Sequence, residues 1–224
     1  MRDNYKQFQR QFGIVRPSQL QFPIVVVGAG GIGSWTTLAL AKMGCTNITV
    51  VDPDRVEEKN TPSQIYTKED IGLFKVAALH RVVLQLTGIQ IGFATEKFEQ
   101  WYPLNELRGE VIVVSVDSLE ARRRIWKTLK GVILFFGLLI DARMAGELLR
   151  IIAVTPFPPQ TVERYEKTLT KNKIAHKEPC TQRAVVYNTF LCGGFIANTV
   201  KKYATKESFS PNMVFDITHS QLFA

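Results

Sequence analysis

A glycine-rich turn between an apolar strand and a helix constrains the fold of this chain more than any other feature. Residues 24–27 form a β-branched apolar run, typical of a strand that is buried on both faces. Gly28, Gly30 and Gly33 follow at the spacing of a dinucleotide-binding turn. The first glycine permits the turn, the second lets a phosphate approach the backbone, and the third lets the helix pack closely. We therefore expect an α/β fold that binds a nucleotide where a helix over residues 32–43 begins.

A second strand supports this expectation. Residues 47–51 are expected to form this strand, and Asp52 follows it as a carboxylate placed to hydrogen-bond ribose hydroxyls. The strand before the turn, the helix after it and the acid beyond favour a nucleotide site over a purely structural glycine turn. A nicotinamide-dependent oxidoreductase would show the same features, so this part of the sequence leaves the reaction open.

The polar segment after Asp52 points to one kind of nucleotide chemistry. Its notable residues are Asp54, Asn60, Gln64, Gly72 and Lys75. In order and spacing they resemble the ThiF/MoeB/ubiquitin-activating superfamily, whose second-strand acid is followed by an Asn, a Gln and a Gly-x-x-Lys. An oxidoreductase would leave Asp54, Asn60 and Lys75 unexplained.

The resemblance extends over most of the chain, from about Arg10 to Lys202. Further matches are the N-terminal Arg-Gln element at residues 8–11, Asp117 after an apolar run at 111–116, Arg122, the strand exit at 141–144, and Cys180 before a long apolar helix. It implies a Rossmann-like ThiF/MoeB fold, an α/β architecture with a mostly parallel sheet flanked by helices and an antiparallel extension.

The expected organisation is an N-terminal arm, partly helical, over residues 1–21 and a single adenylation domain over residues 22–224. Within the domain we interpret the lysine-rich residues 157–179 as a mobile crossover segment above the active site. The other expected elements are a helix from Asp70, as N-cap, to Leu86, strands at 89–94, 111–116 and 132–140, a helix at 118–130, an antiparallel strand at 148–154, a helix at 183–203 and a last strand at 213–217.

Two charged residues are candidates for handling ATP and Mg²⁺. Lys75 would neutralise phosphate charge, although an exposed lysine on a helix surface is the usual alternative. The resemblance implies a magnesium-associated role for Asp117, and a carboxylate at the carboxyl end of a strand suits that ion. Its alternative is to cap the helix that follows. Asn60 is expected to contact substrate, although Asp54, Asn60 and Gln64 could instead satisfy loop backbone groups.

The chain departs from the family at Ser63, where an arginine usually precedes the Gln. Arg143 or Lys59 could replace the missing phosphate-binding cation, or adenylation could be weak. Arg10 could also contribute, because the resemblance implies that this arginine reaches across a dimer into the partner's site. A solvated arm residue is the alternative for Arg10.

Cys180 is the candidate nucleophile. It follows a proline and precedes a predicted helix, and a helix N-terminus lowers the pKa of a thiol. Its thiolate could accept the acyl group as a thioester. Cys45 and Cys192 are expected to be buried and inert, while His176 could assist Cys180.

Composition limits the remaining classes. The net charge is +8, but no nucleic-acid motif or dense lysine block is present, so we expect a protein partner rather than nucleic acid. Three cysteines without paired spacing favour a reducing compartment and exclude the zinc site of some relatives. The N-terminus has no signal-peptide core, and the apolar run at 131–140 is too short to span a bilayer. We expect a cytoplasmic protein.

Together these features predict ATP- and Mg²⁺-dependent adenylation of the C-terminal carboxylate of a ubiquitin-like protein or peptide. Transfer to Cys180 and then to a downstream conjugating enzyme would follow, and the enzyme would be a homodimer. The alternative that Ser63 supports is a nucleotide-binding scaffold without activity, and the less favoured one is the oxidoreductase.

Overall fold

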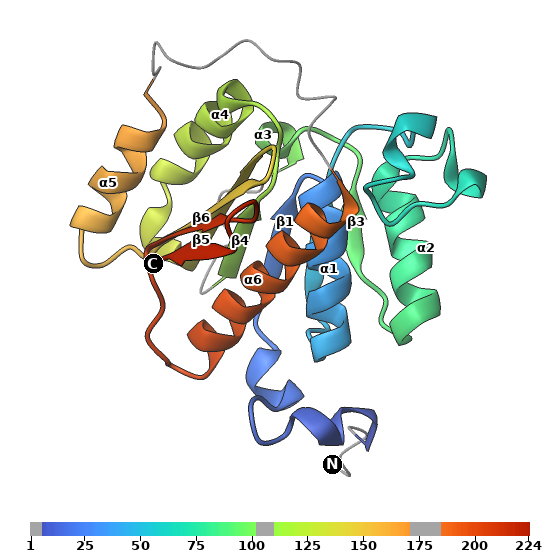
Figure 1. Cartoon of the computed structure of the whole chain (residues 1–224), viewed down its shortest axis with the longest axis horizontal. Helices are drawn as coiled ribbons and strands as arrows, with labels where there is room; N and C mark the ends of the chain where they lie inside the picture. The colour runs from blue at the N-terminus through green and yellow to red at the C-terminus, as the bar shows by residue number, and fades with distance from the viewer. Residues whose placement is uncertain (1–5, 102–109, 171–184) are drawn as a thin grey trace.

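A computed structural model describes residues 6–101, 110–170 and 185–224. These residues build one eight-stranded sheet in the order β3-β2-β1-β4-β5-β6-β7-β8 (Figure 1). The strands are β1 (Ile24–Val27), β2 (Ile48–Val51), β3 (Gly92–Ala94), β4 (Glu110–Val114), β5 (Phe136–Ala145), β6 (Leu148–Val154), β7 (Asn212–Asp216) and β8 (Gln221–Phe223). The α-helices are α1 (Gly31–Met43), α2 (Lys75–Thr87), α3 (Phe98–Trp101), α4 (Leu119–Lys130), α5 (Gln160–Thr168) and α6 (Val186–Ala204).

The strand orientation in the sheet changes from parallel to antiparallel after β5. Strands β1 to β5 pair in parallel, whereas β6, β7 and β8 each pair antiparallel to the preceding strand. Val27, at the end of β1, is in register with Val114, and Val114 is in register with Asp141 of β5. The predicted fold, a mostly parallel sheet with an antiparallel extension, is therefore confirmed.

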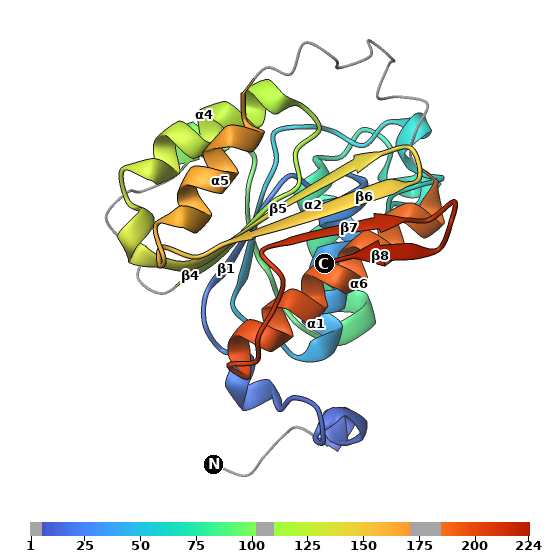
Figure 2. The same ribbon diagram turned by 60° about the vertical axis from the view of Figure 1, so that its left-hand side comes forward.

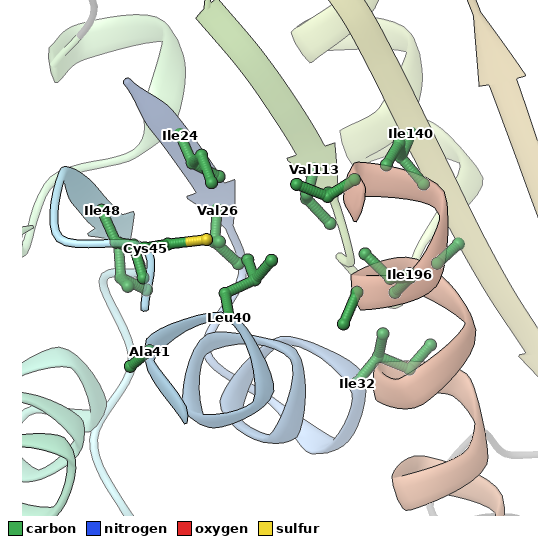
Figure 3. Close-up of a cluster of buried hydrophobic side chains, with 14 of the residues drawn as sticks. Ile24, Val26, Ile32, Leu40, Ala41, Cys45, Ile48, Val113, Ile140 and Ile196 are labelled. Atoms are coloured by element: carbon green, nitrogen blue, oxygen red, sulfur yellow. The ribbon is translucent and has the colours of Figure 1, made fainter. Parts of the chain in front are cut away.

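Helices cover both faces of the sheet, as the two views show (Figures 1 and 2). Helices α1, α2 and α6 pack on one face, in a core that includes Leu40, Ile196 and Val26. Figure 3 shows Leu40 of α1 and Ile196 of α6 turned toward the strands of this face. Helices α3, α4 and α5 pack on the other, around Ile125 and Tyr165. Burial on both faces explains why the parallel strands consist almost entirely of β-branched and leucine residues.

The N-terminal arm is partly helical, as expected. Two 3₁₀ turns, Lys6–Gln11 and Pro17–Leu20, precede β1. Gln11 anchors the first turn to the C-terminal end of α1, because its Nε2 donates to the carbonyl of Met43 at 2.7 Å. No helix in the described ranges is long and apolar enough to cross a membrane.

The expected helix start at Asp70 is wrong. Asp70 is fully buried and closes a 3₁₀ turn, Lys68–Asp70, where its Oδ2 accepts from the backbone N–H of Thr67 at 2.8 Å. Gly72 then takes a φ of +89°, a conformation that interrupts any helix, and α2 begins only at Lys75. Lys75, the candidate phosphate-binding residue, is therefore the first residue of its helix.

Part of residues 157–179, the segment interpreted from the sequence as a mobile crossover, forms a helix. Residues 160–168 form α5, whose Tyr165 is 1% exposed and packs edge-on against Trp126 of α4. One apolar stripe is enough to bury an otherwise polar helix. Residues 171–179 lie outside the described residues. The expected strand at 132–140 is also displaced, because Ile133–Phe135 form a 3₁₀ turn before β5.

Candidate nucleotide site

The glycine loop lies between β1 and α1, at the carboxyl edge of the parallel strands. Gly28 has a φ of +100°, which a side chain would strain. A Cβ on Gly33 would lie 1.8 Å from the carbonyl oxygen of Gly28, so only glycine permits this packing of helix on loop. A Cβ on Gly30 would meet nothing within 4 Å, since it points into open space where α1 begins. That space and the free N–H groups of the helix can accept a phosphate.

Asp52 holds this loop in place. It is 7% exposed, and its Oδ2 accepts from the backbone N–H of Ala29 at 2.6 Å. Its Oδ1 accepts from the backbone N–H of Asp54 at 2.7 Å. Burial raises the pKa of Asp52, and these hydrogen bonds oppose the shift. Each oxygen keeps a second lone pair, so a ribose contact remains compatible with this geometry.

Two further residues fix the loop from outside the glycine motif. The hydroxyl of Tyr66 donates to the carbonyl of Ala29 at 2.6 Å, and burial raises the pKa of Tyr66 well above its usual value. The hydroxyl of Ser115, after β4, lies 2.9 Å from the carbonyl of Gly28. Neither residue belongs to the glycine pattern, and only the folded topology brings them to the loop.

Lys75 lies beside the carboxylates of Asp52 and Asp54. Its side chain is almost fully buried, with the whole residue 8% exposed. Nζ donates to Asp54 Oδ2 at 3.0 Å, and the Lys75 charge also acts on Asp52. The side chain of Asp54 is 66% exposed, so the pair sits at a boundary between protein and solvent. Burial excludes the alternative of an exposed helix lysine and places a cation next to the loop-binding carboxylate.

Asn60 and Gln64 differ in their surroundings. Asn60 is 8% exposed, and its Oδ1 accepts from the backbone N–H of Glu57 at 2.8 Å. That oxygen therefore accepts a hydrogen bond from the loop backbone, which is the alternative role given above for Asn60. Gln64 Oε1 is buried and has no hydrogen-bond partner in the described part of the chain. A buried unpaired acceptor is rare, and a donor group on a bound molecule would satisfy it.

Ser63 marks the position of the missing arginine. Its backbone carbonyl accepts from Trp35 Nε1 and from the hydroxyl of Thr189, each at 3.0 Å, so the segment is clamped between α1 and α6. The two expected substitute cations are both engaged. Lys59 pairs with Glu57 at 2.8 Å, and Arg143 pairs with Asp141 at 2.7 Å.

Arg122 serves the scaffold rather than the ligand. It is 5% exposed and donates to the fully buried carboxylate of Asp141, to the carbonyl of Val116, and to the carbonyl of Ala142 at 2.8 Å. Burial, and then the charge of Arg143, lowers the pKa of Arg122 to about 10. Arg122 therefore joins the segment just after β4 to the middle of β5, beneath the carboxyl edge of the sheet.

Asp117 is exposed just beyond the end of β4. It does not cap α4, because the hydroxyl of Ser118 does so by accepting from the backbone N–H of Ala121 at 3.1 Å. No group of three metal-ligating side chains occurs in the described ranges. A magnesium ion that arrives with a triphosphate needs only one or two protein carboxylates, so an exposed Asp117 fits that ion.

Arg10 is not brought to the glycine loop of its own chain. It lines a cleft with Lys42 and Leu86, at the C-terminal ends of α1 and α2. The loop lies at the N-terminal end of α1, about 20 Å away along a helix of this length. Figure 1 shows the arm and the loop at opposite ends of α1.

The candidate nucleophile Cys180 and its neighbour His176 lie outside the described residues. Cys45 and Cys192 are both fully buried, as expected, and burial raises the pKa of each thiol to about 12. Both are therefore protonated at neutral pH and are poor nucleophiles.

A comparison with family models decides the classification, because the model described as "ThiF family" matches residues 18–222. The chain belongs to the ThiF family. Among its relatives, the NEDD8-activating enzyme E1 catalytic subunit of Arabidopsis thaliana is 34% identical over 106 residues, covering 46% of this ThiF-family chain and 23% of the relative. The tRNA threonylcarbamoyladenosine dehydratase of Escherichia coli K12 is 41% identical over 64 residues, covering 28% and 24%.

These matching segments span only about a quarter of either relative. Among solved structures, E. coli MccB with AMPCPP and MccA superposes with a TM-score of 0.76 at 17% identity. That match covers 99% of this ThiF-family chain and 71% of MccB. The likeness to MccB establishes a shared fold.

Proposed function

We propose that this ThiF-family chain is an adenylyltransferase that uses ATP to activate the C-terminal carboxylate of a ubiquitin-like protein or peptide. The observation that carries the proposal is the buried lysine beside the loop: Lys75 Nζ lies 3.0 Å from Asp54, next to the carboxylate of Asp52 that holds the glycine loop. A lysine that is already held in this position suits the negative charge of a triphosphate. A dinucleotide site built on the glycine loop alone would not explain it.

In the proposed reaction an oxygen of the substrate carboxylate attacks the α-phosphorus of ATP. The bond from that phosphorus to its bridging oxygen breaks, and pyrophosphate leaves with the bonding electrons. Lys75 exchanges Asp54 for phosphate oxygens and offsets the negative charge that develops on the leaving group. The amides at the start of α1, opposite Gly30, hold a phosphate group.

The remaining site residues would orient the nucleotide. Asp52 would accept from the ribose hydroxyls, and the unpaired Gln64 oxygen would accept from a donor of the bound substrates. Asp117 would hold Mg²⁺, which supplies charge neutralisation at the phosphates when bound. Relatives support the nucleotide, since E. coli MccB has also been solved with ATP.

Transfer to a thiol forms the second part of the proposal. Cys180 would attack the carbonyl carbon of the acyl adenylate, form a thioester and release AMP. Proximity to a helix N-terminus would favour its thiolate, and α6 begins at Val186, six residues after Cys180. A downstream conjugating enzyme would then receive the acyl group.

A homodimer would complete the site. Because Arg10 lies at the far end of α1 from its own glycine loop, it can serve a nucleotide only in a second copy of the chain. An exposed apolar surface on α6 and α1 could bury against that copy, since Phe190 is 49% exposed and lies 3.9 Å, between ring centroids, from Trp35. Mixing Arg10→Ala with Lys75→Met chains should restore part of the activity through hybrid dimers. A monomer in light scattering at micromolar concentration would contradict the dimer.

Pyrophosphate exchange tests the central reaction. Labelled pyrophosphate should enter ATP when the enzyme is supplied with peptides that carry a free C-terminal carboxylate. The same peptides with an amidated C-terminus are the matched control and should support no exchange. Binding of ATP without exchange on any free-carboxylate peptide or carrier would favour the scaffold instead.

A further inference from the structure

A second pocket lies on the opposite face of the sheet from α1, between α5 and the strands β6 and β7. We call it the α5 pocket, and its volume is about 270 Å³. Figure 2 shows α5 standing over β5 and β6 on this side of the molecule. The lining residues include Arg150, Ile152, Arg164 and Asn212.

The α5 pocket is cationic and contains no acid. Arg150 and Arg164 line it, while no aspartate or glutamate does. Arg150 is half-buried and uses Nε to donate to Asn212 at 2.8 Å. Neither Arg150 nor Arg164 forms an ion pair with any residue of the described ranges. The remaining guanidinium N–H groups of both arginines are thus open to an acceptor.

A third arginine adds to the positive charge. Arg143 of β5 is paired directly with Arg150 of β6 across the antiparallel ladder. Like charges in opposed positions of a sheet destabilise it. Arg143 shares the single carboxylate of Asp141 with Arg122, so the local charge is not neutralised. Burial and the neighbouring Arg143 lower the pKa of Arg150, as expected for a cation that lacks an anion nearby.

The α5 pocket is aligned with the nucleotide loop in the direction that crosses the strands of the sheet. Val27, which ends β1 before the glycine loop, is in register with Val114, then with Asp141, then with Ile152 on the pocket wall. Three strand spacings separate Val27 from Ile152, a distance of about 14 Å. One extended polypeptide can therefore reach from the loop to the pocket.

We propose that the α5 pocket binds an acidic side chain of the polypeptide substrate, four to six residues before its C-terminus. The proposal rests on the proposed adenylation of that C-terminus. An extended chain advances about 3.3 Å per residue, so about 14 Å corresponds to four residues, and a path around the sheet edge takes one or two more. The guanidinium groups of Arg150 and Arg164 receive the carboxylate.

Peptide binding without ATP tests this inference separately from catalysis. The probes are fluorescent ten-residue Gly/Ser peptides with a free C-terminus and one Glu placed at each position from third to eighth before the end. Anisotropy should show affinity about five- to tenfold higher for Glu at the fourth to sixth position than for the Ala peptide, the range expected of a partly exposed charged hydrogen bond.

Variants identify the pocket. Arg150→Gln with Arg164→Gln should abolish the preference for Glu, and Arg164→Gln alone, an exposed helix position, should reduce it. Lys167→Gln removes one charge from the same helix outside the pocket and should leave the preference unchanged. A preference that persists in the double variant, or equal binding of Glu and Ala peptides to wild type, would overturn the proposal.

A further outcome concerns small anions. Free glutamate or inorganic phosphate can be tested as a competitor against the unlabelled Glu peptide. If either displaced the fluorescent peptide as effectively as the unlabelled peptide does at equal concentration, the pocket would be a small-anion site and the substrate assignment would fail. The proposed function fails in a different way, through absence of ATP binding and pyrophosphate exchange. The two failures are therefore distinguishable.

Discussion

Lys75 forms two hydrogen bonds with Asp54. The side-chain Nζ donates to Oδ2 at 3.0 Å, and the backbone N–H donates to the backbone carbonyl at 2.9 Å. The carboxylate end of this pair is exposed while the lysine is buried. A phosphate that enters from solvent can replace the Asp54 carboxylate without moving the helix. The relationship shows how a cation is kept in place at the candidate nucleotide site without a bound ligand.

Lys75→Met should therefore remove activity while keeping the fold. Methionine preserves the buried volume, and loss of one preorganised charge contact in a transition state costs about a hundredfold in rate or more. Pyrophosphate exchange and thermal unfolding are the measurements. Lys59→Met removes an exposed lysine of the same loop region and should change neither. Near-normal exchange in Lys75→Met would show that the active site lies elsewhere.

Alanine at two glycines should separate folding from nucleotide binding. Gly33→Ala places a Cβ 1.8 Å from the Gly28 carbonyl and should strongly destabilise the protein. Gly30→Ala places a Cβ in open space, so the fold should remain while the methyl group occupies the phosphate position. Melting temperature and ATP titration report the two effects. Wild-type ATP affinity in Gly30→Ala would argue against a phosphate at this loop.

Asp52 should give the folded state an unusual pH dependence. Burial raises its pKa in the folded state above the ordinary value of 3.8. The unfolded chain then loses the proton first as pH rises, so the contribution of Asp52 to stability is greatest below 3.8 and falls until the folded-state pKa is passed. Between pH 3.5 and 7, wild type should lose stability relative to Asp52→Asn. The opposite slope in paired thermal unfolding experiments would contradict the raised pKa.

The three cysteines should differ in reactivity. Burial raises the pKa of Cys45 and Cys192 to about 12, so few of these thiols ionise at neutral pH. Iodoacetamide at pH 7.5, read by mass spectrometry, should label Cys180 first. Cys180→Ala should keep pyrophosphate exchange and lose any thiol-sensitive adduct with a carrier, while Cys192→Ala should lose neither. An adduct that survives Cys180→Ala would disprove the assignment.

The sequence predicted those parts of the fold that depend on local pattern. Short apolar runs such as residues 24–27 became buried strands because parallel strands are covered on both faces. The glycine spacing predicted the turn, since Gly28 and Gly33 meet steric demands that no other residue satisfies. Helix α5 escaped prediction because its few apolar residues, Val162 and Tyr165, pack against residues that are distant in sequence, such as Trp126 of α4.

The candidate site was predictable only in part. Asp52 follows from the strand and turn spacing and Lys75 from the family resemblance, but the role of Tyr66 follows from neither, because it depends on a hydrogen bond to a residue 37 positions earlier. The start of α2 was misplaced because Asp70 is a good N-cap in sequence, while in the fold its carboxylate is used by Thr67 and Arg81. Tertiary contacts decide such cases, and a single sequence does not display them.

A calorimetric titration of the wild-type protein with ATP and Mg²⁺, paired with a titration with NAD, tests the central claim most directly. The buried Lys75 beside the glycine loop predicts saturable binding of ATP with Mg²⁺, together with stabilisation of about 2.7 kcal/mol at a hundred times the dissociation constant. NAD should not bind. Saturable binding of NAD with no binding of ATP would contradict the proposed adenylation and favour a nicotinamide-dependent oxidoreductase.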